Sequence, residues 1–439
     1  MTDLHLQSKM MSEKVNVLLL GNGGRENALA WKFSQSTLLN TLHIAPGNGG
    51  TDAFGTNVNI AVNDFDGIAN YCLQHKITIV VVGPEDPLVK GIVDYFAKHE
   101  ALQHIYVFGP DKTAAQLEGS KDFSKQFMFR HQIPTAKYQT FVKGEEDKAI
   151  QFLETLSPPY VLKADGLAAG KGVLIVKELT AAKVNVHAML GGMFGEASAK
   201  LVIEEFLDGI EVSYFAMSDG ANYVILPEAK DYKRIGEGDT GLNTGGMGAV
   251  SPVPFADEAF TEKVIQQVIK PTFEGFKKEH INYVGFLFFG LIKVNNEPKV
   301  IEYNCRMGDP ETEVVLPRIE SDLLEAIVKA KDQKIADYTI QFSAKTCTTV
   351  IAVSKGYPEE YEKGKILTIK QNPINGIIFH AGTHIADKQL KTNGGRVIAS
   401  TGLGENIEEA LKNSYQNLDM ITYEGMQYRK DIGQDLLKF

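Results

Sequence analysis

The run Val300-Ile-Glu-Tyr-Asn304 combines two oxygen ligands with the spacing of a β-strand. Side chains alternate between the two faces of a strand, so we expect Glu302 and Asn304 to project from one face. Magnesium prefers oxygen ligands and takes several of them from water and nucleotide phosphates. One carboxylate and one amide therefore predict a site for a nucleotide-bound magnesium or manganese ion. The alternative interpretation is a polar pair on an edge strand.

The segment after this strand, Cys305-Arg-Met-Gly-Asp-Pro-Glu311, adds a cation. Arg306 could hold a carboxylate or phosphate through two parallel hydrogen bonds, or could form a structural salt bridge. Another charged group, Asp231-Tyr-Lys-Arg234, precedes a glycine-dense loop that extends from Gly236 to Gly248. Apolar strands flank this loop, which favours an ordered active-site loop over a disordered connector.

The segment Leu162-Lys-Ala-Asp-Gly-Leu-Ala-Ala-Gly-Lys-Gly172 joins two predicted strands through small residues. Backbone amides of such a loop can surround phosphate oxygens, while Lys163 or Lys171 neutralises their charge. The loop is not a Walker A motif, because Gly170-Lys-Gly172 leads into the strand Val173–Val176 and not into a helix. We interpret it as a mobile loop over a nucleotide, with a surface hairpin without ligand as the alternative.

The stretch Val202–Glu211 indicates a strand that leaves the edge of its sheet. The free backbone N–H and C=O groups of such a strand could recognise an adenine ring. Glu204 and Glu205 fit equally well as solvent-exposed carboxylates, and the sequence does not separate the two interpretations.

The turn Gly21-Asn-Gly-Gly-Arg-Glu26 follows an apolar run and precedes a helical pattern. Backbone N–H groups at the start of a helix bind phosphate well. A dinucleotide site fits poorly, because Glu26 replaces the last glycine of that motif and the second strand ends in Pro46-Gly-Asn-Gly-Gly-Thr51 without an acidic residue. We therefore predict a phosphate monoester site, with a purely conformational glycine turn as the alternative.

The elements that must position these residues follow from the hydrophobic pattern. Up to about residue 115, apolar runs alternate with helical spacing, which predicts an open parallel α/β sheet. The apolar runs are Val15–Leu20, Leu42–Ala45, Ile77–Val82 and Ile105–Phe108.

The central part of the chain replaces this alternation with predicted antiparallel pairs of strands. The predicted pairs are Tyr160–Lys163 with Val173–Val176, Lys200–Glu205 with Glu211–Met217, and Phe286–Val294 with Lys299–Asn304. Beyond about residue 335, short strands at Thr348–Ser354 and Ile377–His380 lie between glycine-rich turns. They predict a smaller α+β domain.

Composition narrows the class of protein. A chain of 439 residues is long enough for roughly two to four domains. Its formal net charge of −10 argues against a nucleic-acid partner, although a local basic pocket for a small phosphorylated substrate remains compatible with it. No apolar stretch approaches the ~18 residues of a membrane helix, so we expect no membrane association.

Three cysteines, Cys72, Cys305 and Cys347, lie far apart without any Cys-x-x-Cys pair. This usage predicts a reducing, cytoplasmic location. The first thirteen residues are polar and lack the apolar core of a secretion signal, so we interpret them as an extension before the first strand.

The order of motifs resembles the glycinamide ribonucleotide synthetase family, of the ATP-grasp superfamily, over nearly the whole chain. The matching segments are Gly21–Glu26, Pro46–Asn48, Gly83–Glu85, Leu117–Lys121, Lys163–Gly172, Asp239–Gly241, Asn243–Gly248, Gly308–Thr312, His380–Thr383, Thr392–Arg396 and Arg429–Gly433. The chain departs from the usual pattern at Asn27, Asp86, Tyr232 and Leu242.

The resemblance implies three domains. These are an N-terminal α/β domain for phosphoribosylamine over residues 14–115, an ATP-grasp domain over 116–335 with a mobile lid at about 137–204, and a C-terminal domain over 336–439. Because the chain stops soon after Arg429–Gly433, we expect the monofunctional form of the family.

The implied reaction joins glycine to 5-phosphoribosylamine at the expense of ATP, through glycyl phosphate, in the second step of purine synthesis. The resemblance assigns metal binding to Glu302 and Asn304. It assigns ATP to Lys121, Lys163, Gly170, Lys171, Gly172, Glu204, Glu205, Phe206, Leu207 and Glu211. The residues assigned to the other substrates are Gly23, Gly24, Arg25, Glu26, Asn48, Asp239, Asn243, Gly308, Asp309, Arg396 and Lys430, and those assigned to catalysis are Asp231, Lys233, Arg234 and Arg306.

We expect a monomer that makes transient contact with the amidotransferase that supplies phosphoribosylamine. Two rival hypotheses remain open from the sequence. One is an ATP-grasp ligase for a different carboxylate and nucleophile, because the nucleotide site alone does not name the acceptor. The other is a nucleotide-sensing or scaffold protein without chemistry.

Overall fold

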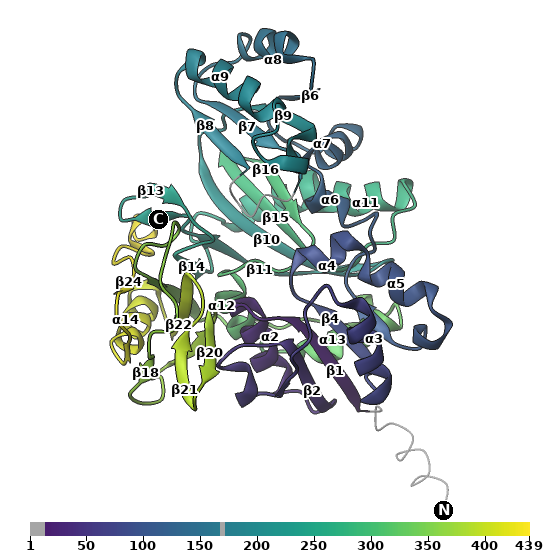
Figure 1. Cartoon of the computed structure of the whole chain (residues 1–439), viewed down its shortest axis with the longest axis vertical. Helices are drawn as coiled ribbons and strands as arrows, with labels where there is room; N and C mark the ends of the chain where they lie inside the picture. Colours follow the sequence, from purple (N-terminus) through teal and green to yellow (C-terminus); the bar gives the residue numbers. More distant parts are fainter. Residues whose placement is uncertain (1–13, 167–171) are drawn as a thin grey trace, which may run out of the picture.

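The computed structural model describes residues 14–166 and 172–439. The predicted N-terminal extension and the candidate nucleotide residues Gly170 and Lys171 lie outside the described residues. Figure 1 shows residues 138–166 and 172–205, called the lid below, at one end of the molecule, and the rest of the described chain, called the body, beneath them. The first and last parts of the chain lie side by side at the opposite end. None of the helices within the described residues combines the length and apolar character that crossing a bilayer requires.

The N-terminal part is a parallel sheet, as the sequence predicts, and it has five strands in the order β3-β2-β1-β4-β5. Its elements are β1 (Val15–Gly21), α2 (Gly24–Phe33), β2 (Leu39–Pro46), β3 (Thr56–Asn57), α3 (Phe65–Gln74), β4 (Ile79–Val82), α4 (Glu85–Lys90), α5 (Ile92–Lys98) and β5 (Tyr106–Phe108). Because the strands are parallel, the loops that follow β1, β2 and β4 meet at one edge of the sheet.

The lid is a four-stranded sheet, β6-β9-β7-β8, covered by two helices. Its elements are β6 (Tyr138–Val142), α8 (Glu146–Leu153), β7 (Tyr160–Ala164), β8 (Val173–Val176), α9 (Leu179–Leu190) and β9 (Lys200–Glu205). The side chains of Phe141, Leu153, Leu162 and Ile203 belong to a hydrophobic cluster that is separate from the main core. Helices α6 (Gln116–Gly119) and α7 (Lys121–Arg130) lead into the lid.

The predicted pairing of Lys200–Glu205 with Glu211–Met217 is wrong. Strand β9 pairs with β6 and β7 in the lid, whereas β10 (Ile210–Asp219) pairs with β11 and β15 in the body. The residues between β9 and β10 carry the chain from one sheet to another and do not form a hairpin turn. The other two predicted pairs are confirmed.

The body contains a nine-stranded sheet whose main path is β16-β15-β10-β11-β14-β17-β22-β19. The strands are β10, β11 (Tyr223–Asp231), β14 (Gly248–Ser251), β15 (Val284–Val294), β16 (Glu297–Asn304), β17 (Thr346–Ser354), β19 (Gly376–His380), β22 (Arg396–Gly404) and β24 (Met426–Gln427), which pairs with β17. The sheet therefore passes without interruption from the central part of the chain into the C-terminal part.

Helices and small hairpins complete the body. They are β12 (Arg234–Gly236), β13 (Thr240–Asn243), α10 (Glu258–Val264), α11 (Lys270–Lys278), α12 (Thr312–Val315), α13 (Leu323–Lys331), β18 (Thr368–Ile369), β20 (Thr383–Ala386), β21 (Gln389–Thr392), α14 (Ile407–Leu418) and β23 (Ile421–Thr422). One hydrophobic core joins the N-terminal sheet, the nine-stranded sheet and the C-terminal strands, and it includes Leu19, Phe215, Leu287 and Ile398.

Candidate functional site

The predicted metal ligands lie at the end of β16. Glu302 and Asn304 pair with Gly290 and Phe288 of β15, so they occupy alternate positions of a regular ladder and share a face. An irregularity in the register precedes Glu302 and leaves Ile301 without an opposite partner. A side chain at position 290 would approach the Cγ atom of Glu302 to 3.0 Å, and glycine there leaves the carboxylate its space.

Four cations surround the carboxylate of Glu302. Its side chain is exposed, and the surrounding protein desolvates the carboxylate enough to raise its pKa. The charges of Lys233, Lys163, Lys121 and Arg306 outweigh this effect and lower the pKa below the ordinary value. The cations come from β7, from the start of α7 and from loops beside β11 and β16. An ionised carboxylate inside a ring of cations can bind a metal ion that arrives with a polyphosphate.

Glu302 and Asn304 suit a metal ion that arrives bound to a nucleotide better than a metal ion that the protein holds by itself. Among residues 14–166 and 172–439, no group of three or more His, Cys, Asp or Glu side chains is arranged to hold a metal ion. The pair Glu302 and Asn304 supplies two ligand side chains, with at most three oxygens. Magnesium commonly completes its octahedron with water and phosphate oxygens, so two protein ligands suffice when a nucleotide is present.

The described ends of the predicted phosphate loop contact the first turn of α7 and each other. Asp165 accepts hydrogen bonds from the Asp122 backbone at 2.8 Å and from the Ser120 hydroxyl at 3.1 Å, and Lys121 Nζ donates to the Gly166 carbonyl at 3.2 Å. The Gly172 carbonyl accepts from the Ala164 amide at 2.8 Å, which closes the hairpin at its base. Lys121 and Lys163 are thereby brought close to each other and to Glu302.

The candidate adenine residues lie at the end of β9 and in the segment that follows it. Glu204 is 3% exposed, so the alternative of a solvent-exposed carboxylate does not apply to it. Its Oε1 atom lies 3.0 Å from Lys163 Nζ, while Glu205 accepts a hydrogen bond from the Lys137 amide at 2.9 Å. Phe206 is 38% exposed, and Leu207 is partly buried.

The charged residues of the segment 231–234, at the end of β11, lie in two different places. Lys233 Nζ lies 2.5 Å from Glu211 Oε2. Burial lowers the pKa of Lys233, but Glu211, Asp231 and Glu302 outweigh this effect and raise it. Burial raises the pKa of Asp231, as do the charges of Glu211 and Glu302. Arg234 instead donates to the Gly241 carbonyl at 3.0 Å and belongs to the β12–β13 hairpin.

Arg306 lies in a network of ion pairs. Its Nε atom is 3.3 Å from Glu85 Oε2 and its Nη2 atom is 2.9 Å from Glu118 Oε1, which matches the salt-bridge alternative. The same Nη2 atom lies 3.5 Å from Asn304 Oδ1, so Arg306 also borders the predicted metal ligands. The guanidinium therefore connects the N-terminal part with the end of β16.

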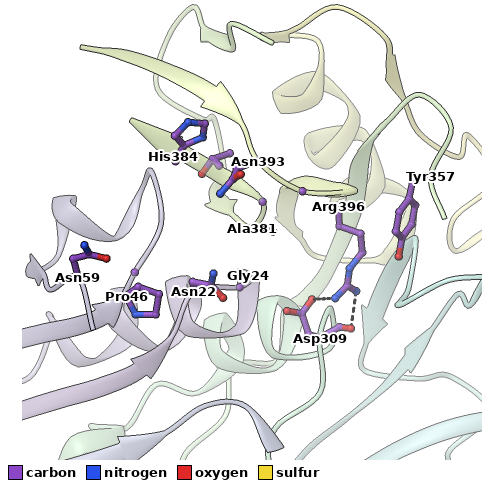
Figure 2. Close-up of a pocket in the computed structure, with 15 residues that line it drawn as sticks. Asn22, Gly24, Pro46, Asn59, Asp309, Tyr357, Ala381, His384, Asn393 and Arg396 are labelled. Carbon is purple, nitrogen blue, oxygen red and sulfur yellow. Dashed lines mark hydrogen bonds and ion pairs between the residues drawn. The ribbon is translucent and has the colours of Figure 1, made fainter. Parts of the chain in front are cut away.

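A cavity of about 540 Å³ lies between the N-terminal and C-terminal parts. Figure 2 shows residues of the C-terminal part, among them Ala381, His384 and Asn393, facing Asn22, Gly24 and Pro46. The lining residues are Asn22, Gly23, Gly24, Pro46, Gly47, Asn59, Asp309, Tyr357, Ala381, Gly382, Thr383, His384, Asn393, Gly394 and Arg396.

The start of α2 forms one wall of this cavity. Glu26 Oε2 accepts a hydrogen bond from the Gly23 amide at 2.7 Å, and the Arg25 amide donates to Asp309 Oδ2 at 3.2 Å. Glu26 fills the space beside Gly21 and Gly83, where an added Cβ would approach its side chain to 2.4 Å and 2.2 Å. Gly21 also has φ +129°, a conformation that favours glycine. Glycine is therefore required here by both packing and backbone geometry.

Asn48 stabilises the loops of this wall. Its amide nitrogen donates to the carbonyls of Asn22, Gly23 and His380 at 3.1, 3.2 and 2.8 Å. Its carbonyl oxygen accepts from Asn27 at 3.3 Å, and Asn27 in turn accepts from the His380 amide. Because both ends of the Asn48 side chain are engaged, it positions the phosphate turn and does not present a free donor to the cavity.

Arg396 closes the cavity on the C-terminal side (Figure 2). Its Nη2 atom lies 2.8 Å from Asp309 Oδ1, and Nη1 donates to the carbonyls of Asp309 at 2.8 Å and Gly245 at 2.6 Å. The Gly308 carbonyl accepts from Arg25 at 3.4 Å. These contacts join β22, the Gly236–Gly248 loop and the segment after β16 around one opening.

Four predicted substrate residues, Arg25, Glu26, Asn48 and Gly308, support the walls of this cavity without lining it, and three others lie farther from it. Asp239 and Asn243 are on the exposed β12–β13 hairpin, and Lys430 is exposed near the C-terminus. Asp239 Oδ1 pairs with Arg429 at 2.8 Å, and the Lys430 amide donates to Glu237. Their contacts fasten the hairpin to the C-terminal segment.

Several lining residues were not predicted. Thr383 belongs to the motif His380–Thr383 and Asn393 to the motif Thr392–Arg396. Of these two motifs only Arg396 was predicted to bind substrate, although their other polar residues carried the same signal. Asn59 and Tyr357 are single polar residues in loops and gave no signal. Tyr357 accepts a hydrogen bond from the Gly245 amide at 2.9 Å, which only the fold reveals.

Three family profiles match the chain in order. They are the N domain of phosphoribosylglycinamide synthetase over residues 15–118, its ATP-grasp (A) domain over 119–312 and its C domain over 347–435. The chain belongs to the phosphoribosylglycinamide synthetase family. The predicted family and fold class are thereby confirmed. In the terms of this family, Glu302 and Asn304 lie in the A domain, the start of α2 in the N domain and Arg396 in the C domain.

Individual relatives agree with the phosphoribosylglycinamide synthetase profiles. The chain is 45% identical to phosphoribosylamine–glycine ligase of Haemophilus influenzae, over 95% of this chain and 98% of that one. It is 44% identical to the bifunctional purine biosynthetic protein of Pichia angusta, over 97% of this chain and 54% of that longer protein. The crystal structure of phosphoribosylamine–glycine ligase from Thermotoga maritima has a TM-score of 0.82 and 35% identity, covering 95% of this chain and all of that one.

Proposed function

We propose that this chain catalyses the ATP-dependent ligation of glycine to 5-phosphoribosylamine, which gives glycinamide ribonucleotide, ADP and phosphate in purine synthesis. Full-length similarity to phosphoribosylamine–glycine ligases supports the reaction. The observation that carries the proposal most directly is the meeting of two sites on one segment. Glu302 and Asn304 border the cation-lined cleft, and Asp309, a few residues later, lines the cavity at the start of α2.

We assign one task to each part of the chain. Residues 14–115 hold phosphoribosylamine, residues 116–335 hold ATP beneath a lid at about 137–204, and residues 336–439 close the substrate cavity. The separate hydrophobic core of the lid supports its treatment as a moving unit. The single core beneath the other two parts supports a fixed relation between them.

For the nucleotide, Lys121, Lys163 and Lys233 neutralise phosphate charge. The chain segment from Glu204 to Leu207 holds the adenine, and Glu211 positions Lys233. Glu205, Gly172 and the undescribed Gly170 and Lys171 complete the nucleotide assignment. Glu302 and Asn304 would hold a magnesium or manganese ion, which supplies charge neutralisation for the phosphates when bound.

The chemistry requires little covalent work from the protein. The carboxylate of glycine attacks the γ-phosphate of ATP to give glycyl phosphate and ADP, and the amine of phosphoribosylamine then displaces phosphate to form the amide. The cations of the cleft stabilise charge on the transferring phosphoryl group, and closure of the lid excludes water from the acyl phosphate. Arg306 is our candidate for orienting the glycine carboxylate.

For the second substrate, the backbone amides at the start of α2 suit the phosphate of phosphoribosylamine. Asp309 and Arg396 border the rest of that cavity, and Gly308, Arg25, Glu26 and Asn48 fix its walls. Asp231 lies with Lys233 and Glu211 near Glu302. Arg234, together with Asp239, Asn243 and Lys430, belongs to the β12–β13 hairpin and the C-terminal segment that it contacts. We assign these four residues to ordering that hairpin over the bound substrates.

We further propose a cytoplasmic monomer that uses small-molecule substrates, without nucleic-acid or membrane partners. Transient contact with the amidotransferase that forms phosphoribosylamine would protect an unstable amine. Analytical ultracentrifugation of the chain alone and mixed with that amidotransferase tests both statements. A stable dimer of the chain would contradict the first of them.

A coupled assay tests the function. Purified protein receives Mg-ATP, glycine and freshly generated phosphoribosylamine, and both ADP and the amide product are measured. We expect ADP release at full rate only when glycine and the amine are both present. Alanine and bicarbonate replace glycine in parallel reactions. Faster ADP release with either of them would support a different ATP-grasp ligase, and no ADP release in any mixture would indicate a protein without this chemistry.

A further inference from the structure

Lys125 is a buried lysine in the middle of α7 that the proposed reaction does not use. Only 2% of the residue is exposed. An ammonium group is rarely buried to this extent unless charged or polar partners surround it. The partners of Lys125 therefore indicate why the cation is there.

These partners come from three different elements. Lys125 Nζ lies 3.0 Å from Glu204 Oε2 at the end of the lid strand β9. It donates to Thr135 Oγ1 at 2.7 Å and lies 5.6 Å from the ring centroid of Tyr138, at the start of β6. Lys125 thus occupies the junction at which the lid joins the body.

Glu204 is shared between two lysines. Its Oε2 atom faces Lys125, while its Oε1 atom lies 3.0 Å from Lys163 in the nucleotide cleft. Burial raises the pKa of Glu204, but Lys163 and Lys125 outweigh this effect and lower it. The three side chains therefore combine one carboxylate with two lysines. Because Lys125 takes one oxygen of Glu204, the carboxylate neutralises Lys163 only in part.

The other contact of Lys125 leads to the metal strand. Thr135 Oγ1 donates to the Val300 carbonyl at 2.7 Å, and the Val300 amide donates to the Pro134 carbonyl at 2.8 Å. Val300 lies two residues before Glu302 on β16. A continuous chain of contacts thus connects the last residues of β9 with the strand that carries the predicted metal ligands.

We propose that Lys125 is a positioning residue for the nucleotide, which shares the carboxylate of Glu204 with Lys163 and fixes the end of β9 against β16. In its presence Lys163 keeps its charge available for the phosphates of ATP. Without Lys125, Glu204 pairs with Lys163 alone and neutralises it. The inference rests on the proposed function only in that the cleft binds ATP.

The experiment is a double-mutant cycle read by direct binding. Mg-ATP and adenosine are titrated into the full chain and into Lys125→Met, Glu204→Gln and the double variant. We expect Lys125→Met to weaken ATP binding by about tenfold, the size expected for a hydrogen-bonded charge pair, and to leave adenosine within twofold. In the Glu204→Gln background the same change should cost less than threefold, because the carboxylate through which Lys125 acts is gone.

A merely structural lysine gives a different pattern. It would weaken ATP and adenosine alike, or its cost would be equal in both backgrounds, and either result overturns the proposal. The matched control is Lys200→Met, which removes another lysine between β9 and α7, paired with Asp122 at 2.5 Å. We expect this control to leave both affinities unchanged.

A second variant covers the case in which Lys125→Met does not fold. Thr135→Val keeps the lysine and removes the hydroxyl between it and Val300. We expect a roughly threefold loss of ATP affinity with no change for adenosine, since a neutral hydrogen bond is weaker than a charged one. Unchanged ATP affinity would overturn the connection to β16. Because both readouts are binding constants, they stand even if glycine is not the acceptor in the ligase assay, so the two failures are distinguishable.

Discussion

The nucleotide cleft and the substrate cavity are enclosed in different ways. The residues proposed to bind ATP lie where the body meets a lid that has its own small hydrophobic core. Among the described residues, the segment between β9 and β10, the residues around α7 and an ion pair of Lys299 with Glu205 join the lid to the body. The cavity lies between N-terminal and C-terminal parts that share one core and are joined by ion pairs and hydrogen bonds. Under the proposed assignments, this difference predicts that ATP binds in a site that opens and closes, whereas the sugar phosphate binds in a preformed one.

The largest expected effect concerns the cleft. Glu302→Ala removes the carboxylate around which four cations gather, and we expect ADP formation to fall by about 10³-fold. The fold should persist, because no hydrophobic contact is lost. Steady-state ADP release and thermal melting measure the two quantities. Glu297→Ala, at the exposed far end of the same strand, is the control, and retained turnover in Glu302→Ala would remove the metal assignment.

The independence of the lid from the main core can be tested with two matched substitutions that each create a cavity. Leu153 in the lid core and Leu324 in the main core are both fully buried, so replacement of either by alanine should cost about 2–5 kcal/mol of its own unit. We expect faster hydrogen exchange in the lid alone for Leu153→Ala and throughout the body for Leu324→Ala. Equal acceleration in both regions by either variant would show one cooperative unit.

The preformed cavity depends on Arg396. Arg396→Lys retains the charge but cannot reach Asp309 and Gly245 together, so we expect the KM for phosphoribosylamine to rise by about tenfold. The Kd for ATP should stay within twofold, because the cleft is not altered. Lys391→Arg, on the neighbouring hairpin, controls for general effects. A parallel loss of ATP affinity would mean that the two sites are not separately built.

The smallest effect is a pH dependence at the junction of the N-terminal and C-terminal parts. Burial lowers the pKa of His380 to about 4 from the ordinary 6.5. Between these values the unfolded chain binds a proton that the folded chain does not, so stability rises with pH in this window and is lost as pH falls. Between pH 4.5 and 7 the melting temperature of His380→Gln should rise by roughly 2–4 °C less than that of the unmodified protein. An unchanged slope would contradict the assignment.

Local periodicity made much of the fold and the cleft predictable. The alternation of side chains along Val300–Asn304 placed two oxygens on one face, and the glycine turn at Gly21 marked the start of α2. The pairing of Lys200–Glu205 was predicted wrongly, since neighbouring strands usually form hairpins and nothing local shows that the chain changes sheets there. The engagement of Asn48 by His380 joins residues 332 positions apart, which no local pattern reveals.

The uninterrupted sheet has a consequence for dissecting the protein. Strand β14 pairs with β17, which lies beyond residue 335, at the position where a domain boundary would be cut. A fragment that ends there would lack β17 and would expose the N–H and C=O groups of β14 at the edge of the sheet. It would also expose the apolar side chains that the C-terminal part covers. Such an edge recruits other chains, so we expect the isolated fragment to aggregate. Experiments on the separate activities therefore require point substitutions within the intact chain.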